Sequence, residues 1–321
     1  MRALVYKGPE RLDYIDYADP APQQGEHLIS VESVGICGSD MHAFLGHDDR
    51  RPAPLILGHE VAGTVRADGT RVTVNPLVTC GTCAYCLEGR DNLCATRQII
   101  SMPPREGGFA EAVVLPERNL IDLPDHIHAD QAALAEPIAC GWHGTRLARQ
   151  LADGRALVIG GGAIGVGAAL SLAAQGVGDV RIAEPNMGRQ DYLRRTCGFD
   201  TLDPGCLAPE DQFPIVVDAV GFDATRALAS AHAAPGGVIL HIGLGSPEGG
   251  LDIRRMTLQE ITFIGTYTYT AQDFRDTAQA MFDGRLGALD WIETRPLAEG
   301  ARAFADIRAG RVAAPKIILK P

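Results

Sequence analysis

Apolar and polar residues alternate along the second half of the chain in blocks of different length. Short apolar runs of strand length lie at residues 213–221, 236–245 and 261–269. Helix-like runs separate the earlier ones, at residues 188–198 and 222–234. Strands that alternate with helices are typical of a parallel, doubly wound sheet. The pattern therefore predicts an α/β domain in this region.

A stretch of nineteen residues, 156–174, carries no charged side chain. Its length would suit a membrane-spanning helix, but three consecutive glycines directly after "ALVI" favour a strand, a tight turn and a helix. The same glycines form a G-x-G-x-x-G motif, whose backbone N–H groups can approach a pyrophosphate at a helix N-terminus. We therefore predict a dinucleotide site here and no membrane span. The expected cofactor-binding residues are Gly160, Gly162, Ala163, Ile164 and Gly165.

A second strand follows, and Glu184 stands at its end, nineteen residues after Gly165. A carboxylate at this position accepts hydrogen bonds from ribose hydroxyls and repels a 2′-phosphate. The sequence therefore favours NAD over NADP. Arg189 is close enough in sequence to contact the adenosine, or it is a surface arginine that pairs with Glu184.

Composition narrows the class of protein. The chain has 321 residues, 46% hydrophobic and 21% charged, which suits a globular protein of two ordinary domains. A net charge of −11 argues against general affinity for nucleic acid or anionic lipid. No signal peptide is recognisable. We therefore predict a cytoplasmic protein whose reduced thiols favour metal binding over disulfides.

Four of the eight cysteines lie within fifteen residues, in the pattern C-x2-C-x2-C-x7-C. This spacing can aim four sulfurs at one point, as a tetrahedral zinc site needs. Protein would fill all four positions of that site, so it would hold the fold together without activating a substrate. Iron–sulfur ligation is the competing interpretation. The predicted structural zinc ligands are Cys80, Cys83, Cys86 and Cys94.

Candidates for a reactive centre are dispersed along the chain. Cys37, His59 and Glu60 are side chains of the types that bind zinc. Glu136 is an acid within an apolar stretch, where a carboxylate needs a partner. Each also has a structural explanation: Cys37 as a small core residue, His59 as a hydrogen-bonded histidine and Glu136 as a helix cap. Spacing alone leaves both interpretations open.

Taken together, these motifs resemble the zinc-containing medium-chain dehydrogenase/reductase family over nearly the whole chain. The resemblance rests on "GICGSDMH", "LGHEVAGTV", the four-cysteine stretch, "GGFAEAVVLP", "EP" at 136–137 and the glycine motif. Glutamate at the "EP" position is similar to the sorbitol, idonate and galactitol-phosphate dehydrogenases. The resemblance implies a GroES-like, partly open β-barrel catalytic domain over 1–137, a Rossmann NAD-binding domain over 138–270, and a return of 271–321 to the catalytic domain.

The resemblance also implies two zinc ions per chain, one structural and one catalytic. Cys37 and His59 would bind the catalytic zinc, and Glu60 or Glu136 would complete the protein ligands. Asp40 would be the partner that orients His59.

A proton relay is implied as well. Ser39 and His42 fall where the relay residues of the family fall. Ser39 would take the substrate proton, the cofactor ribose would pass it to His42, and His42 would hand it to solvent. The alternatives are that Ser39 caps a helix starting near Asp40 and that His42 is a surface residue.

The implied activity is zinc-dependent hydride transfer from a secondary alcohol of a polyol, sugar or sugar acid to NAD. Sorbitol dehydrogenase has an arginine where this chain has Thr268, between Tyr267 and Tyr269, and that difference argues against sorbitol itself. Arg50 and Arg51 would receive a carboxylate or phosphate of the substrate, or lie in a solvated loop.

Other classes of function stay open at this point. They are a threonine-type or simple alcohol dehydrogenase on the same scaffold, a zinc-ribbon protein that binds nucleic acid, and a noncatalytic sensor of dinucleotide. Members of the family commonly form dimers or tetramers through an edge strand, here 261–269. The expected partners are thus a small alcohol and further copies of the chain, as a homodimer or homotetramer, with no nucleic acid and no membrane.

Overall fold

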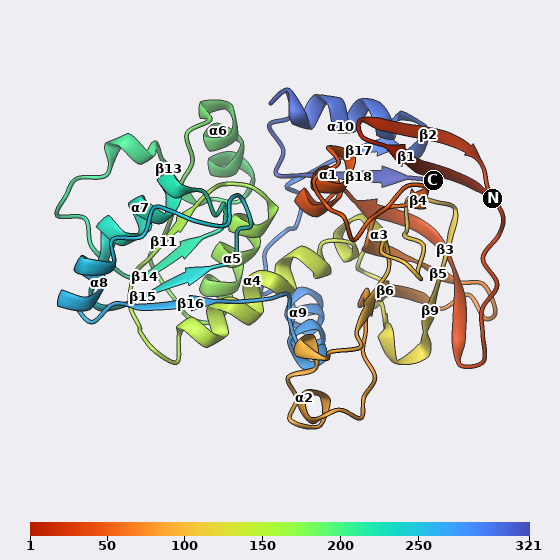
Figure 1. Cartoon of the computed structure of the whole chain (residues 1–321), viewed down its shortest axis with the longest axis horizontal. Helices are drawn as coiled ribbons and strands as arrows, with labels where there is room; N and C mark the ends of the chain where they lie inside the picture. The colour runs from red at the N-terminus through yellow and green to blue at the C-terminus, as the bar shows by residue number, and fades with distance from the viewer. The chain divides into compact units, whose positions relative to one another are not determined.

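The computed structural model describes residues 1–321, which divide into two compact units. The first unit comprises Met1–Glu136, Thr270–Phe282 and Ile292–Pro321. The second comprises Pro137–Tyr269 and Asp283–Trp291. Both units are thus discontinuous in sequence, and Figure 1 labels their elements.

The first unit is built mainly from short strands. These are β1 (Arg2–Gly8), β2 (Arg11–Asp16), β3 (Glu26–Gly35), β4 (Leu55–Ile56), β5 (Glu60–Val65), β6 (Arg71–Val74), β7 (Leu77–Val78), β8 (Gln98–Ile99), β9 (Ala112–Pro116), β10 (Leu120–Asp122), β17 (Ile292–Pro296) and β18 (Lys316–Lys320). The largest sheet has the order β10-β6-β5-β3-β18-β17, with β9 also paired to β3. Strands β2, β1 and β4 form a second sheet, and β7 pairs with β8. Strand β18, the last strand of the chain, therefore lies beside β3, which comes from the first part of the chain.

Five helices belong to this unit: α1 (Gly38–Phe44), α2 (Ala84–Leu87), α3 (Ala129–Ala132), α9 (Ala271–Phe282) and α10 (Gly300–Arg308). Aromatic contacts anchor the short helix α1. The Phe44 ring lies 5.2 Å from the ring of Phe304, which itself packs edge-on against Phe109 at 5.9 Å. Such pairs add to the burial of three large apolar side chains. Helix α1, which follows Cys37, is held in place by this cluster.

The second unit contains one six-stranded sheet. Its strands are β11 (Ala156–Ile159), β12 (Val180–Ala183), β13 (Asp200–Leu202), β14 (Phe213–Asp218), β15 (Ala233–His241) and β16 (Thr262–Gly265). The order is β13-β12-β11-β14-β15-β16, and every pair is parallel. The helices are α4 (Ala135–Ala148), α5 (Ala163–Ala174), α6 (Met187–Thr196), α7 (Asp223–His232) and α8 (Ile253–Leu258). The predicted doubly wound sheet is confirmed.

Two details of this sheet differ from the sequence-based expectation. Strand β13 was not predicted, because it has three residues and only Thr201 of them is buried. The run 261–269 is strand only as far as Gly265. It cannot extend as strand through residue 269, since Thr268 has a φ of 46°, in the left-handed region that a β-branched residue rarely adopts.

The uncharged stretch 156–174 folds as β11, the glycine turn and α5, as predicted. None of the helices has both the length and the apolar composition that crossing a bilayer requires.

Candidate metal centres and cofactor site

Three dispersed side chains converge in the first unit. One ligand atom from each of Cys37, His59 and Glu60 lies within 4.8 Å of the other two. His59 and Glu60 are buried, whereas Cys37 is partly exposed. The strand register explains the meeting, because Glu60 opens β5 opposite Gly35, the last residue of β3. Cys37 follows two residues later.

Asp40 holds the two segments that carry these side chains. Its Oδ2 accepts a hydrogen bond from the Cys37 backbone N–H at 3.0 Å, and its Oδ1 accepts one from Gly58 at 3.1 Å. Burial alone would raise the pKa of this carboxyl, but the nearby His59 lowers it, and the net pKa is below the usual value. Asp40 is therefore a buried carboxylate. It also caps helix α1, with Cys37 as the N-cap residue, so Ser39 is not the cap.

His59 is oriented through one ring nitrogen. Its Nδ1 lies 3.5 Å from Asp40 Oδ1 and 3.4 Å from the hydroxyl of Ser101. Burial lowers the pKa of His59, but the charges of Asp40 and Cys37 raise it by more than burial lowers it. The net pKa is well above the ordinary value. With Nδ1 directed at Asp40, the Nε2 nitrogen remains for a metal ion.

Glu60 presents two oxygens in different surroundings. Oε1 accepts a hydrogen bond from Lys316 Nζ at 2.5 Å. Oε2 is buried and has no hydrogen-bond partner. A Cβ atom added to Gly35 would lie only 1.8 Å from Oε2, so this oxygen occupies space that any other residue would fill. A buried carboxylate oxygen without a partner is costly, and a cation would satisfy it.

The charges around Lys316 also fit a divalent cation. Burial lowers the pKa of Lys316, but Glu60, Cys37 and Glu136 raise it, so the net pKa is above the usual value. One ammonium group thus faces three side chains that are anionic when Cys37 is a thiolate. A zinc ion would supply the two remaining positive charges, and the donor set of sulfur, imidazole and carboxylate suits zinc.

Glu136 is placed differently from Glu60. It is buried in the first turn of α4 and interacts electrostatically with Lys316. It is not among the donors that converge within 4.8 Å. Of the two predicted glutamates, the structure therefore brings Glu60 to Cys37 and His59.

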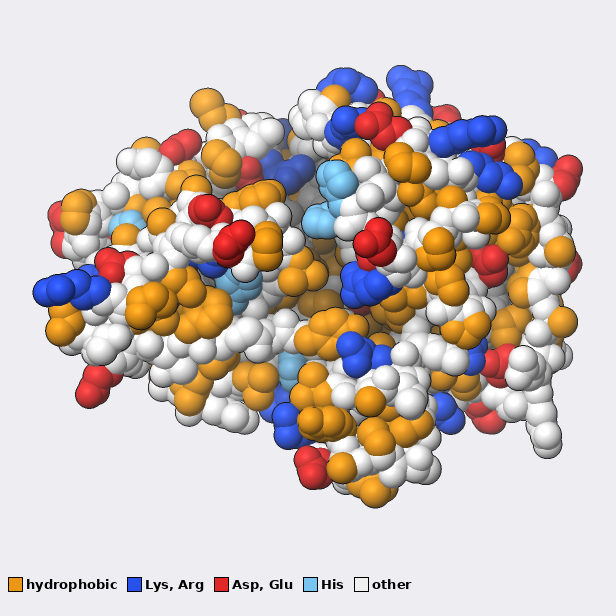
Figure 2. Space-filling view, in the orientation of Figure 1, with side chains coloured by type: hydrophobic (Ala, Val, Ile, Leu, Met, Phe, Trp, Pro, Cys, Tyr) orange, Lys and Arg blue, Asp and Glu red, His pale blue; other side chains and the backbone are white.

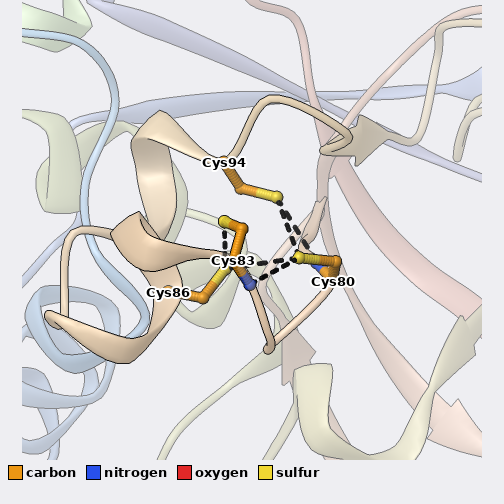
Figure 3. Close-up of side chains that lie close together, drawn as sticks. All are labelled: Cys80, Cys83, Cys86 and Cys94. Carbon is orange, nitrogen blue, oxygen red and sulfur yellow. Dashed lines mark hydrogen bonds between the residues drawn. The ribbon is translucent and has the colours of Figure 1, made fainter.

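The four cysteines of the lobe, residues 80–94, also converge (Figure 3). Their sulfurs lie 3.5 Å apart for Cys83 and Cys86, 3.6 Å for Cys80 and Cys94, and 3.9 Å for Cys80 and Cys86. A tetrahedron of sulfurs at zinc–sulfur distances of about 2.3 Å has edges of about 3.8 Å. None of the cysteines is in a disulfide. The four residues therefore fit a tetrahedral zinc ion.

Backbone groups favour the thiolate form of Cys80, whereas burial raises the pKa of Cys86 to about 12. Hydrogen bonds from the N–H groups of Thr82 and Cys83 lower the pKa of Cys80 to about 5. The lobe has little core of its own, since only Asn92 and Cys94 are buried between Cys80 and Cys94. Hydrophobic side chains gather on this part of the surface in Figure 2, among white and charged groups, and Tyr85 and Leu87 are 42% and 76% exposed. Such a segment is better suited to be held by metal ligation than by apolar burial.

In the second unit, the predicted glycines surround the turn between β11 and α5. Gly160 has a φ of 98°, and a Cβ atom on Gly165 would lie 1.8 Å from the Gly160 carbonyl oxygen. Gly162 is the N-cap residue of α5, and a Cβ atom there would meet nothing within 4 Å. Ala163 and Ile164 form the first turn of α5. The open N-terminus of α5 fits a pyrophosphate.

Glu184 follows β12 and lies against the glycine turn. Its Oε2 accepts a hydrogen bond from the Gly161 N–H at 2.8 Å, and its Oε1 accepts one from Asn186 at 2.9 Å. Each carboxylate oxygen can still accept a second hydrogen bond, so the group remains suited to ribose hydroxyls. Arg189 lies in the first turn of α6, where its N–H donates to the side chain of Asn186.

The remaining candidate residues differ in how exposed they are and in what they contact. Ser39 is half-buried and His42 is exposed, both on α1. Arg51 is not solvated, because it is buried and donates to the carbonyl oxygens of Ser101 and Ser39 and to Asp48. Arg50 is exposed and pairs with Asp48. Arg51 therefore supports the loop and is not available to receive a substrate anion.

Sequence reasoning missed three residues of this centre: Lys316, Ser101 and Gly35. Lys316 begins an apolar run at the end of the chain, and a charge there was a usable signal. Its partner Glu60 is 256 positions away, however, and no local pattern joins the two.

A GroES-like unit with a zinc-type donor set, together with a Rossmann sheet, defines a class of dehydrogenases, and comparison with known proteins agrees. The alcohol dehydrogenase GroES-like domain family matches residues 23–125. L-galactonate-5-dehydrogenase of Escherichia coli (strain K12) is 30% identical over 306 residues, which cover 90% of this chain and 89% of that protein. The chain belongs to the zinc-type medium-chain alcohol dehydrogenases and is an oxidoreductase, which confirms the resemblance found in its motifs.

Two solved structures are similar over the whole chain. Galactitol-1-phosphate dehydrogenase from Escherichia coli has a TM-score of 0.88 at 25% identity, covering 100% of both chains. A protein from Sinorhizobium meliloti 1021, solved with NADP bound, has a TM-score of 0.89 at 25% identity, covering 100% of this chain and 99% of that one. Similarity over full length leaves no support for an isolated zinc-ribbon protein that binds nucleic acid.

Proposed function

We propose that this protein catalyses the zinc-dependent, NAD-linked oxidation of a secondary alcohol in a polyol, sugar or sugar acid. The observation that carries this proposal is the convergence of Cys37, His59 and Glu60, with one buried carboxylate oxygen left without a partner. A carboxylate in place of a further thiolate makes such a centre polar, which suits substrates with many hydroxyl groups. The names of the Escherichia coli relative and of the galactitol-phosphate enzyme point to the same substrate class.

Zinc, when bound by Cys37, His59 and Glu60, supplies Lewis-acid polarisation of the alcohol oxygen. Asp40 keeps the ring of His59 in the orientation and tautomer that ligation needs. The Ser39 hydroxyl accepts the substrate proton while it releases its own proton to the relay, and exposed His42 hands a proton to solvent.

The second zinc ion of the proposed pair is structural and is held by the four cysteines of the lobe. Its role is to order residues 80–94, which have almost no buried apolar side chain. All four positions around that ion are filled by sulfur, so it offers no place for a substrate.

NAD is the proposed cofactor because the carboxylate of Glu184 lies at the glycine turn, where it repels a 2′-phosphate. Arg189, in the first turn of α6, is proposed to contact the adenosine.

Strand β16 forms the edge of its sheet, and Phe263 on it is 36% exposed. We propose that this edge joins copies of the chain into a homodimer or homotetramer, since an open apolar edge favours pairing. None of the eight cysteines is in a disulfide, which supports a cytoplasmic location.

A screen of NAD reduction tests the proposal. Polyols, hexonates, aldoses and their phosphates are compared with threonine and simple alcohols, and zinc is measured in the same preparation. We expect two zinc ions per chain and the highest kcat/KM for a polyol or hexonate. Highest activity on threonine or ethanol would assign the chain to the threonine-type or simple alcohol dehydrogenases. Full activity after removal of all metal would contradict the proposal.

A further inference from the structure

Lys316 lies at the first position of β18 and is only 3% exposed. Strand β18 runs antiparallel to β3, with Ile318 opposite Gly35. This pairing carries the Lys316 side chain to the end of β3. There Nζ donates to the carbonyl oxygen of Ile36 at 2.9 Å and to Glu60 Oε1 at 2.5 Å.

A buried ammonium group is costly unless it is paired and hydrogen-bonded. The β18 strand alone would accept an apolar residue at this position, as it does at the next three, Ile317, Ile318 and Leu319. The lysine is therefore explained by what it contacts and not by the strand it belongs to. The only side chain to which it donates a hydrogen bond is Glu60, a proposed zinc ligand.

We propose that Lys316 is a positioning residue that controls how strongly Glu60 binds the catalytic zinc, an inference that rests on the function proposed above. By holding Oε1, the ammonium group leaves Oε2 as the oxygen that faces the ion. It also withdraws negative charge from the carboxylate, so Glu60 is a weaker donor than an isolated glutamate. The zinc then keeps more of its polarising power.

The direction of the effect follows from charge. Lys316 would repel a divalent cation bound by Cys37, His59 and Glu60, because both are positively charged, whereas the anionic side chains that face Lys316 would attract it. Without the ammonium, the three acids would hold zinc more tightly and donate more charge to it. Loss of Lys316 is thus expected to strengthen zinc binding and to weaken catalysis, whereas loss of a residue that merely supports the fold would weaken both.

The test uses the full chain loaded with zinc. Release of the catalytic zinc to a chromophoric chelator is timed for the wild type, Lys316→Met, Lys316→Gln and Lys316→Arg. Gln keeps hydrogen-bond donors without the charge, and Arg keeps the charge. We expect release to slow about tenfold and kcat to fall about tenfold in Met and Gln, with near wild-type values in Arg. Lys320→Met is the matched control, because Lys320 lies on the same strand but pairs with Asp130.

A second readout is the visible spectrum of the protein with cobalt(II) in place of zinc. It should change in the Met and Gln variants and not in Arg or in the Lys320→Met control, because stronger donation by Glu60 alters the ligand field. Faster zinc release in both neutral variants would overturn the proposal, as would an unchanged release rate and spectrum. If the Met variant does not fold, the Gln variant decides. A wild type with one zinc per chain and no NAD-linked alcohol oxidation would instead refute the proposed function.

Discussion

The two candidate metal centres of the first unit are built in opposite ways. The lobe takes its four sulfurs from fifteen consecutive residues, and three of the four cysteines are partly exposed. The other centre takes Cys37, His59 and Glu60 from two separate segments and Lys316 from the end of the chain. The lobe joins like donors into a closed set. The dispersed centre joins unlike donors and leaves one oxygen unsatisfied.

This difference indicates what each ion would contribute to the protein. The lobe has almost no core, so its ion would supply folding free energy. The dispersed centre is already held by hydrogen bonds of Asp40 and Lys316, and by strand pairing around Gly35. An ion bound there would not be needed to bring the residues together and would be available for chemistry. Four variants, in decreasing order of their expected effect on turnover, test this contrast.

Cys37→Ser should have the largest effect on turnover. Removing the only thiolate of the dispersed centre should cost one zinc ion per chain and lower kcat on the order of a thousandfold, since Lewis-acid polarisation is worth several kcal/mol. The melting temperature should change little. Metal content, steady-state kinetics and thermal melting are measured together. Cys206→Ser, at an exposed cysteine outside both centres, is the control. Retained activity in Cys37→Ser would remove the basis for a catalytic zinc.

Asp40→Asn should have the next largest effect. The substitution keeps the size of the side chain but weakens its support of His59 and its hydrogen bonds to Cys37 and Gly58. Loss of such a supporting group typically costs about 10- to 100-fold in metal affinity or activity. Zinc titration and kcat are the measurements. Unchanged zinc affinity would show that His59 does not depend on Asp40 for its orientation.

Gly35→Ala is a smaller change that acts on one atom. The new Cβ atom would lie 1.8 Å from Glu60 Oε2, so the carboxylate must move. We expect kcat to fall roughly tenfold, below the hundredfold that a 1 Å misplacement can cost. Gly178→Ala is the control, because a Cβ atom there meets nothing within 4 Å. Equal kinetics in the two variants would argue that Oε2 is not a ligand.

Cys83→Ser should change turnover least, within about threefold for the folded protein. Its effect should fall on stability, because the lobe would lose its ion. A loss of about 2–3 kcal/mol would lower the melting temperature by roughly 5–10 °C. Zinc content, melting and activity per folded molecule are compared with those of Cys206→Ser. A large loss of turnover with unchanged melting would reverse the roles assigned to the two centres.

Most of the second unit could be predicted from local sequence. Alternating runs gave the order of strands and helices, because both faces of a parallel sheet are covered and its strands are apolar throughout. The two elements that differ from the prediction also have local explanations. Strand β13 is too short and polar to stand out, and the last apolar run is strand only as far as Gly265, with left-handed backbone at Thr268.

In the first unit, the spacing of the four cysteines alone identified one group of zinc-type ligands, whereas Cys37, His59 and the two glutamates were grouped only by the family resemblance. The four cysteines are close in sequence, so a few turns suffice to bring their sulfurs together. Only the tertiary structure decided that Glu60, not Glu136, joins Cys37 and His59, that Arg51 is buried against the loop, and that Lys316 holds Glu60. These contacts depend on the pairing of β18 and β5 with β3, and strand pairing between distant segments is set by packing of the whole unit rather than by any local pattern.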